Sequence, residues 1–303
     1  MIRSLIVAAA IAAGAVPAVS AQTAPVAGAN APPVPVVAQP PRLDTNVLFA
    51  RDVPVVPMAE WLIEQKGVGE QTGARVLIAA GPAELGRAPP EASRYDSQTF
   101  RFPTGDIRVL RFRKASGGVL HQVTTEKSIY VVQGSAVVDV AGVATDIAAG
   151  DVVSLPGGLL RSRPGKPEDT TVVAFTMRDG AANPRAMVLR GRDARAATIA
   201  AGNDKAGLGG TKVSVQRYPF NGNSIRVARL SGAGRTSPVT PPVDALIYLL
   251  EGPMQITIGD EVKTVTAGDA LREELGKPTW WDVPKKGAFI ATNGPPLNAP
   301  PAR

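Results

Sequence analysis

The chain's one histidine, His121, lies in a stretch whose residue types suit acid–base chemistry or the binding of an anion. A histidine side chain has an unperturbed pKa of about 6.5, so it can release or take up a proton near neutral pH. Glu126 follows five residues later as a candidate partner carboxylate, and the two are the predicted catalytic pair. The alternative is that His121 is a core residue whose ring nitrogens are satisfied by neighbours, while Glu126 forms an ion pair with the adjacent Lys127.

Arg111 and Trp280 are candidates for contact with a ligand. In an extended strand, Arg111 shares a face with Ile107 and Val109. If that face points inward, the planar, always-charged guanidinium suits a carboxylate or phosphate; if the other face does, Arg111 is solvated. The ring of Trp280 suits a sugar or an aromatic ligand at a pocket, whereas the alternative is that it plugs the interior or seals a contact between domains.

The composition argues against nucleic acid as a partner and excludes disulfides. The chain has 33 basic and 26 acidic side chains among 303 residues, a formal net charge of +7, and no cysteine. It contains no basic run with interleaved aromatic residues, so nucleic acid is not an expected partner. Without cysteine there is no disulfide, and burial must stabilise the fold. The 31 glycines and 28 prolines favour many short strands joined by tight turns.

Residues 1–21 have the pattern of a secretory signal peptide. Arg3 precedes an apolar run at residues 5–16, and small residues stand before the expected cleavage site after Ala21. The apolar run is too short to span a bilayer, so no membrane insertion is expected after cleavage. Residues 22–42 are rich in alanine and proline and are predicted to be a disordered tether. We therefore expect an exported protein, either periplasmic or secreted.

The remaining chain contains two copies of one pattern, 118 residues apart (225 − 107 = 118). Identities that keep one register over so long a stretch indicate a tandem repeat of two similar domains. We place the first domain, with an N-terminal arm, at residues 43–178 and the second at residues 179–303. The matches include residues 107–111 on 225–229, Ile129-Tyr130 on Ile247-Tyr248, and Gly150-Asp151 on Gly268-Asp269.

Each repeat consists of short apolar runs bounded by glycine or proline, spaced as in an antiparallel β-barrel or jelly roll. Two segments are ambiguous. Residues 43–68 fit either a short helix around residues 58–65 or an arm lying across a barrel, and residues 194–201 fit either a strand or a short helix. The clearest predicted strands are residues 74–80, 107–113, 128–132, 136–140, 152–155 and 171–176.

His121 stands at the first histidine of a motif that runs glycine, His-x-His, glutamate, glycine, counted back from Gly134. Gly150, Pro156 and Gly158 have the spacing of a second motif, which ends in another histidine. Both motifs are similar to those of the cupin superfamily, and their repetition resembles a bicupin. The resemblance implies an all-β fold of two tandem cupin-like β-barrels, of the double-stranded β-helix or jelly-roll type.

The positions that bind metal in this family are mostly replaced. Counting from His121, the second histidine position holds Val123, the glutamate position holds Lys127 and the third histidine position holds Arg161. A metal in a protein usually needs about three nitrogen or oxygen ligands. No complete metal site and no cofactor are therefore expected, and His121 is the only plausible ligand. The corresponding positions of the second repeat are Val239, Pro241, Ala245 and Thr279.

The first hypothesis for the function is a protein that binds a small anionic, sugar-like or aromatic molecule in its N-terminal barrel. One alternative is a cupin-type enzyme, an isomerase, lyase or dioxygenase, in which His121 is the acid–base group or part of a minimal metal site. Another is a structural protein with filled barrels that forms a homo-oligomer. A fold hosts many functions, so the site must decide. The predicted ligand contacts are His121, Val123, Tyr130, Arg161, Arg111 and Trp280.

Overall fold

The computed structural model describes residues 43–65, 74–90, 92–112, 119–123, 127–140, 143–156, 158–162, 169–177, 185–200, 211–220 and 223–293. Of the strand residues 62–65, 74–79, 119–123, 139–140, 158–162 and 199–200, only the backbone is described. All of this part belongs to one compact unit, Pro35–Arg303. The predicted signal peptide, the predicted tether and Glu126 lie outside the described residues. Within the described ranges, no helix is long and apolar enough to cross a membrane.

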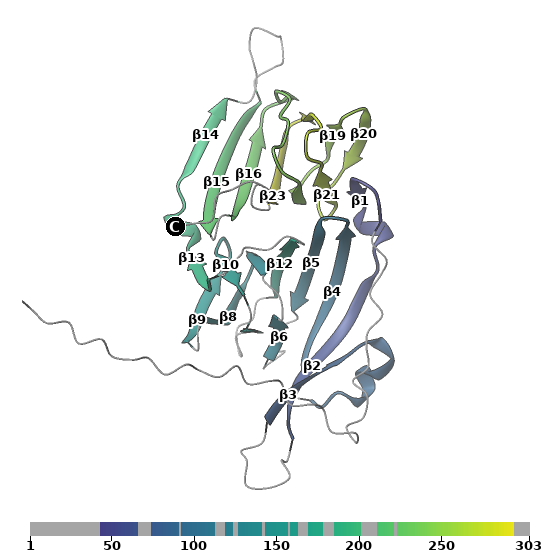
Figure 1. Ribbon diagram of the computed structural model, residues 1–303, viewed down its shortest axis with the longest axis vertical. Helices are drawn as coiled ribbons and strands as arrows, with labels where there is room; N and C mark the ends of the chain where they lie inside the picture. Colours follow the sequence, from purple (N-terminus) through teal and green to yellow (C-terminus); the bar gives the residue numbers. More distant parts are fainter. Residues whose placement is uncertain are drawn as a thin grey trace, which may run out of the picture. The chain divides into compact units, whose positions relative to one another are not determined.

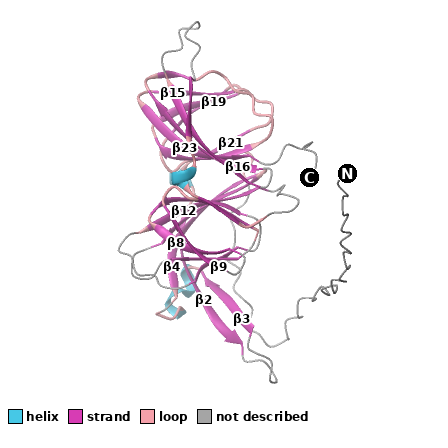
Figure 2. Cartoon of the chain, turned by 90° about the vertical axis from the view of Figure 1, so that its left-hand side faces the viewer, coloured by secondary structure: helices cyan, strands magenta, loops and turns pink. Residues whose placement is uncertain are grey.

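The first repeat folds into a barrel of two antiparallel sheets with a core between them (Figure 1, Figure 2). The large sheet has the strand order β13-β10-β7-β12-β5-β4-β2-β3, and the small sheet has the order β6-β11-β8-β9. The large-sheet strands are β2 (Val55–Gln65), β3 (Ala74–Ala80), β4 (Ser93–Phe102), β5 (Gly105–Phe112), β7 (Lys127–Gln133), β10 (Val152–Leu155), β12 (Thr170–Met177) and β13 (Met187–Leu189). The small-sheet strands are β6 (Val119–Val123), β8 (Ser135–Val140), β9 (Val143–Ala148) and β11 (Gly158–Ser162).

The second repeat folds in the same way. Its large sheet has the order β1-β21-β18-β23-β16-β15-β14, and its small sheet has the order β17-β22-β19-β20. The large-sheet strands are β1 (Val47–Leu48), β14 (Ala196–Ala200), β15 (Lys212–Phe220), β16 (Asn223–Ser231), β18 (Ala245–Glu251), β21 (Ala270–Glu273) and β23 (Lys286–Asn293). The others are β17 (Gly234–Arg235), β19 (Met254–Ile258), β20 (Glu261–Val265) and β22 (Thr279–Val283). Within the described residues, three short 3-10 helices connect strands: η1 (Ala50–Asp52), η2 (Pro82–Arg87) and η3 (Gly191–Asp193).

The predicted fold is confirmed, because each of the six clearest predicted strands coincides with an observed strand within two residues at either end. Of the two ambiguous segments, residues 196–200 form the strand β14. The alternative of a helix around residues 58–65 is wrong, since this segment belongs to β2, which pairs with β4 on one side and with β3 on the other. A short apolar run has no clear period, so pairing on both sides decides its conformation.

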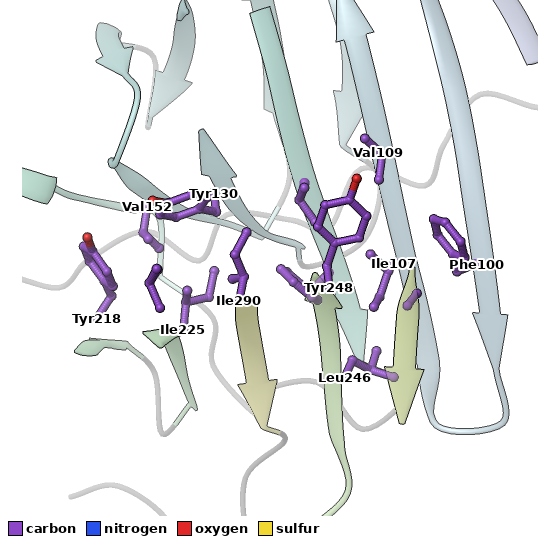
Figure 3. Packing of buried hydrophobic residues seen from close by; sticks show 14 of the residues in the cluster. Phe100, Ile107, Val109, Tyr130, Val152, Tyr218, Ile225, Leu246, Tyr248 and Ile290 are labelled. Atoms are coloured by element: carbon purple, nitrogen blue, oxygen red, sulfur yellow. The ribbon is translucent and has the colours of Figure 1, made fainter. Parts of the chain in front are cut away.

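Alternate residues of β5 belong to two different cores. Leu110 and Phe112 pack inside the first barrel, whereas Ile107 and Val109 pack on the other side of the sheet. That other side faces the large sheet of the second barrel, and the two sheets share one hydrophobic cluster (Figure 3). The large sheet is therefore buried on both faces. Buried members of this shared cluster include Phe100, Ile107, Val109, Tyr130, Val152, Tyr218, Ile225, Leu246, Tyr248 and Ile290.

In each barrel, one edge strand of the large sheet comes from a segment that precedes the other barrel in the chain. We call these two segments, residues 47–52 and 188–193, the arms. The strand β1 precedes the first barrel in the chain but pairs with β21 of the second, and β13 precedes the second barrel but pairs with β10 of the first. The two arms share the pattern Val-Leu-x-x-Arg-Asp, at residues 47–52 and 188–193. Val47 packs in the second-barrel core and Val188 packs against the first-barrel core, so the exchange is reciprocal.

Two equivalent carboxylates hold the arms in place. Asp269 Oδ1 accepts a hydrogen bond from the backbone N–H of Ala50 at 2.7 Å. Asp151 Oδ1 accepts one from the backbone N–H of Gly191 at 2.9 Å. Asp151 also forms an ion pair with Arg190, with 2.8 Å between Oδ2 and Nη1. Because these carboxylates bind backbone groups, they fix the path of each arm and not only its side chains.

The Gly-Asp pair that both repeats keep is explained by this docking. Gly150 and Gly268 have φ values of 93° and 96°, in the left-handed region that favours glycine. A Cβ atom on Gly191 of the arm would lie 2.6 Å from the backbone oxygen of Gly150, so the arm approaches this turn closely. The sequence identity at these positions thus reflects how the two halves of the protein are joined.

Candidate functional site

The candidate residues of the first barrel lie on two paired strands of its small sheet. His121 and Val123 are on β6, and Arg161 is on β11, which runs antiparallel to β6 with Leu160 opposite His121. Only the backbone is described here, and Glu126 lies outside the described residues altogether. The roles predicted for these four candidates stay predictions.

Arg111 lies at the contact between the two large sheets. Its Nη2 atom donates a hydrogen bond to Gln98 Oε1 at 3.1 Å, and its guanidinium lies beside Tyr248 of the second barrel. Arg111 is half-buried on the face of β5 that carries the shared cluster. It is therefore directed neither into its own barrel nor into solvent, an environment that the sequence alternatives did not include.

Tyr130 of the first barrel makes the equivalent contact with an arginine of the second barrel. Arg229 Nη1 donates a hydrogen bond to Gln216 Oε1 at 2.9 Å, and this guanidinium lies beside Tyr130 of the first barrel. Burial raises the pKa of Tyr130 and of Tyr248, and the neighbouring arginine opposes the rise in each case. Figure 3 shows both tyrosines within the shared cluster. The two groups satisfy polar side chains at an apolar contact, which is a packing role.

Trp280 and its neighbour Trp281 point to opposite sides of β22. Trp281 is 5% exposed and packs in the second-barrel core, stacked on Phe289 with 4.9 Å between ring centroids. Trp280 is half-buried, and the guanidinium carbon of Arg235 lies 5.9 Å from its ring centroid. Since adjacent residues of a strand face opposite sides, Trp280 is directed away from the barrel interior.

The second barrel contains a cavity of about 290 Å³. Such a volume is near the lower end of small-molecule pockets, which span roughly 300–1,000 Å³. Its walls come from both sheets of the barrel and from the segment that follows β17. The lining residues are Val213, Val215, Arg217, Arg226, Ala228, Leu230, Thr236, Ser237, Val239, Glu273, Thr279, Trp281, Phe289 and Ala291.

Strand register divides the lining of the cavity into a charged end and an apolar end. Arg217 on β15 is the direct partner of Arg226 on β16. Two residues further along these strands, Val215 pairs with Ala228, and Ala228 pairs in turn with Phe289 on β23. The next inward-facing pair is Val213 and Leu230. Along the large sheet, a ligand in this cavity therefore meets guanidinium groups at one end and hydrocarbon at the other, while Thr236, Ser237 and Thr279 add hydroxyl groups to the opposite wall.

Glu273 lies at the charged end, close to Arg226. Arg226 Nη2 donates a hydrogen bond to Asn293 Oδ1 at 2.6 Å, and Asn293 pairs with Ala245. Ala245 is also the partner of Glu273 across the next strand, so both polar groups flank one position of β18. Arg226 Nε is buried and has no hydrogen-bond partner among the described residues.

Desolvation acts on both charges at this end. Burial raises the pKa of Glu273, and the nearby Arg226 guanidinium lowers it in part. Burial also lowers the pKa of Arg226; Glu273 raises it, and the like charge of Arg217 lowers it further. In each case the cavity disfavours the charged form, as expected where water is displaced without full compensation. A group of opposite charge from a ligand would be bound favourably by either side chain.

The cavity does not fit the metal that the family resemblance implies. Val239 and Thr279, which stand at two of the family's ligand positions, both line it, and the other two positions hold Pro241 and Ala245. None of these offers an imidazole, thiolate or carboxylate donor. Across the described part of the chain, no group of three or more histidine, aspartate or glutamate side chains is placed to hold a metal ion.

Glu273 was missed by the sequence reasoning, although the repeat contains a signal for it. In the 118-residue register, Glu273 falls on Leu155 and Arg217 falls on Thr99. Leu155 is completely buried in the first-barrel core. A charged residue at the counterpart of a buried leucine indicates that the second interior differs in character from the first.

The fold places the chain in a class of protein: it has the cupin fold, in the form of two tandem barrels. AerE from Microcystis aeruginosa is similar with a TM-score of 0.53 and 11% identity, over 68% of this chain and 93% of that one. Pumpkin seed globulin gives 0.52 and 12%, over 67% and 82%. The protein Ylba from E. coli gives 0.50 and 13%, over 68% and 85%. These identities show likeness of fold alone. No family model and no curated protein matches the sequence.

Proposed function

We propose that this protein binds a small organic carboxylate in the cavity of its second barrel. The carboxylate lies at Arg226 and Arg217, and the apolar body of the ligand packs against Trp281 and Phe289. The observation that carries the proposal is Arg226, a half-buried guanidinium that lines the cavity and whose Nε has no partner among the described residues.

The charged end of the cavity supports an anionic ligand. Two guanidinium groups on paired strands repel each other, and Arg226 is partly desolvated as well. An anion between them removes the repulsion and forms charge-assisted hydrogen bonds, for which the planar guanidinium is well suited. A carboxylate matches this fork, because its two oxygens can accept two parallel N–H bonds.

The opposite end of the cavity supports an apolar body. Val213, Leu230, Trp281 and Phe289 present hydrocarbon or aromatic surface there. Burying apolar area contributes about 25 cal/mol for each Å² removed from water. A ring or branched alkyl group attached to the carboxylate therefore adds affinity that a bare inorganic anion lacks.

A direct test is isothermal titration of the purified protein with benzoate, phenylacetate and 4-methylpentanoate, and with the neutral analogue benzamide. We expect the carboxylates to bind and benzamide to bind much more weakly. Arg226→Gln should weaken carboxylate binding roughly 10- to 100-fold, since a hydrogen bond to a charged group contributes about 1.5–3 kcal/mol. The matched control is Arg229→Gln, a residue on the same strand that faces the other barrel.

Two results would contradict the proposal. One is that none of the carboxylates binds at millimolar concentration. The other is that benzamide binds as tightly as benzoate, which would make the arginines irrelevant. A thermal shift provides an independent reading, because a ligand at 100 times its dissociation constant stabilises the folded protein by about 2.7 kcal/mol.

The first barrel keeps its own hypothesis, in which His121 is an acid–base group or a ligand contact. Its motif position supports this, and the small sheet pairs β6 with β11 as a shared site would require. His121→Ala tests it: a binding protein or enzyme that uses the first barrel should lose binding or turnover. The substitution is made in the Arg226→Gln background, where the second barrel is impaired, and binding or turnover that His121→Ala leaves unchanged there would remove His121 from the site.

We also propose that the protein is exported, on the basis of the signal-like residues 1–21. Sequencing the N-terminus of protein recovered from the periplasm or medium should give Gln22 as the first residue. An intact Met1 in protein recovered from cells would contradict export by cleavage.

A further inference from the structure

We propose that the ligand of the second barrel carries a cationic nitrogen next to its carboxylate, so that the cavity fits an apolar α-amino acid in its zwitterionic form. This inference rests on the proposed carboxylate binding and goes beyond it, because it assigns a role to Glu273. The ligand ammonium lies at Glu273, its carboxylate lies at Arg226, and its side chain extends along the apolar wall.

The positions of the two charges support this arrangement. Glu273 and Asn293 flank the same residue of β18, Ala245, and Arg226 reaches that position through its hydrogen bond to Asn293. A carboxylate and a guanidinium therefore lie near one another at the charged end of the cavity. The ammonium and carboxylate groups of an α-amino acid are likewise neighbours, separated by a single carbon atom.

Glu273 and Arg226 attract each other, but this attraction does not offset what burial costs either charge. No ion pair joins Glu273 to Arg226 or to Arg217, although all three line the cavity. The Glu273 carboxyl also makes no hydrogen bond within the described ranges. A charge that loses water without full compensation costs free energy, which a ligand with two opposite charges would recover at both side chains.

The charge balance excludes simpler ligands as a full match. A ligand with only a carboxylate leaves an ionised Glu273 close to a second negative group, so Glu273 must take up a proton for that ligand to bind well. A ligand with only an ammonium group adds a third cation beside Arg217 and Arg226. The zwitterion alone satisfies Glu273 and Arg226 without a change of protonation.

The length of the cavity sets the type of side chain. Two residues along a strand span about 7 Å. A ligand whose carboxylate lies at Arg226 therefore reaches the level of Ala228 and Phe289 with a side chain of the size of leucine or phenylalanine. The walls there are apolar, with Val215 and Trp281 as further members, and they offer no counter-charge for a basic or acidic side chain.

The experiment compares three related ligands by isothermal titration at pH 7.5: L-phenylalanine, 3-phenylpropionate, which lacks the amine, and 2-phenylethylamine, which lacks the carboxylate. We expect L-phenylalanine to bind at least tenfold more tightly than either analogue. Glu273→Gln should remove the preference for L-phenylalanine over 3-phenylpropionate, and Arg226→Gln should weaken both. The control is Glu261→Gln, a carboxylate on β20 that pairs with Lys263 outside the cavity.

The pH dependence gives a second, independent reading. Binding of L-phenylalanine requires ionised Glu273, so its affinity should fall as the pH drops through the raised pKa of this group. Binding of 3-phenylpropionate should show the opposite slope. The other charged groups that line the cavity are Arg217 and Arg226.

The outcomes separate this inference from the proposed function. If 3-phenylpropionate binds the wild-type protein as tightly as L-phenylalanine, the zwitterion inference is overturned and carboxylate binding stands. If neither ligand binds and the simple carboxylates also fail, both proposals are overturned. Should Glu273→Gln not fold, the three wild-type titrations and their pH slopes decide the question without it.

Discussion

The two barrels share one frame but differ in what fills it. At three interior positions the first barrel has larger side chains than the second, and all three are at most 2% exposed. Their counterparts in the second barrel line the cavity. The pairs, in the 118-residue register, are Tyr95 and Val213, Leu110 and Ala228, and Phe112 and Leu230. The comparison teaches that smaller side chains at these three positions leave room for the cavity of the second barrel, where the first barrel has larger, buried side chains.

The equivalent arginines show the same contrast in polar terms. Arg108 Nε of the first barrel donates a hydrogen bond to Ser97 Oγ at 2.8 Å. In the second barrel the counterpart of Ser97 is Val215, and Nε of Arg226 has no partner among the described residues. One arginine is thus committed to its own barrel, while the other keeps a donor for something else.

The largest expected effect on stability comes from replacing a buried residue of the first barrel by its smaller counterpart from the second. Leu110→Ala removes a buried side chain at the position where the second barrel has Ala228, and we expect a loss of about 2–5 kcal/mol in the free energy of unfolding. Urea denaturation measures it. Leu230→Ala, which enlarges an existing cavity, should cost less. Equal costs would contradict the view that the first barrel is packed more tightly than the second at these aligned positions.

A smaller effect is expected at the carboxylates that hold the arms. Asp151→Ala and Asp269→Ala each leave backbone N–H groups without their acceptor; because these hydrogen bonds are only partly buried, we expect a total cost of about 1–3 kcal/mol for each substitution. Because Asp151 also pairs with Arg190 and Asp269 has no such arginine at Phe49, we expect Asp151→Ala to be the more destabilising. Arg190→Ala is the control, and it should account for the difference between the two.

Ala228→Leu is the converse of Leu110→Ala, because it places the residue of the first barrel in the cavity wall of the second. We expect carboxylate binding to weaken at least tenfold, which corresponds to about 1.4 kcal/mol, with little change in the midpoint of urea denaturation. Titration and denaturation of the same sample measure both quantities. Unchanged binding would show that the ligand lies elsewhere.

The smallest effect is a pH dependence of stability that Glu273 of the second barrel should contribute. Since the pKa of Glu273 is raised in the folded protein, this group stabilises the fold below its unfolded pKa of about 4.3, and the contribution is lost as the pH rises through the folded value. Glu273→Gln should flatten that part of the profile of unfolding free energy against pH. A profile that is unchanged by the substitution would contradict the desolvation of Glu273. Its counterpart, Leu155, has no charge to titrate.

The strands and the repeat could be predicted because their signals are local and occur twice. Gly150 and Gly268 mark one turn in both copies, and alternation along residues 107–113 predicts β5. The environment of Arg111 could not be predicted in this way. Alternation of residue types indicates that the two faces of a strand differ. Both faces of this sheet are buried, however, one in the core of the first barrel and one against the second barrel. The pattern cannot distinguish solvent from a second domain.

The site in the second barrel was hidden for a different reason. At the positions where the family binds metal, the residue type best suited to chemistry is His121, and it lies in the first barrel. The cavity depends on missing volume at Ala228 and Val213, and on Glu273 in a strand of ordinary appearance. Such features become visible only when interior positions of the two copies are compared, and that requires knowing which positions are interior.

The exchanged arms also determine the order in which strands can pair while the chain is being synthesised. Val47 pairs with Leu271, 224 positions later (271 − 47 = 224), so β1 has no partner until those residues have been made. At a synthesis rate of about 5–20 residues per second, that wait is roughly 10 to 45 seconds. During this time an apolar Val-Leu segment has no sheet to join, whereas the second arm finds β10 already behind it.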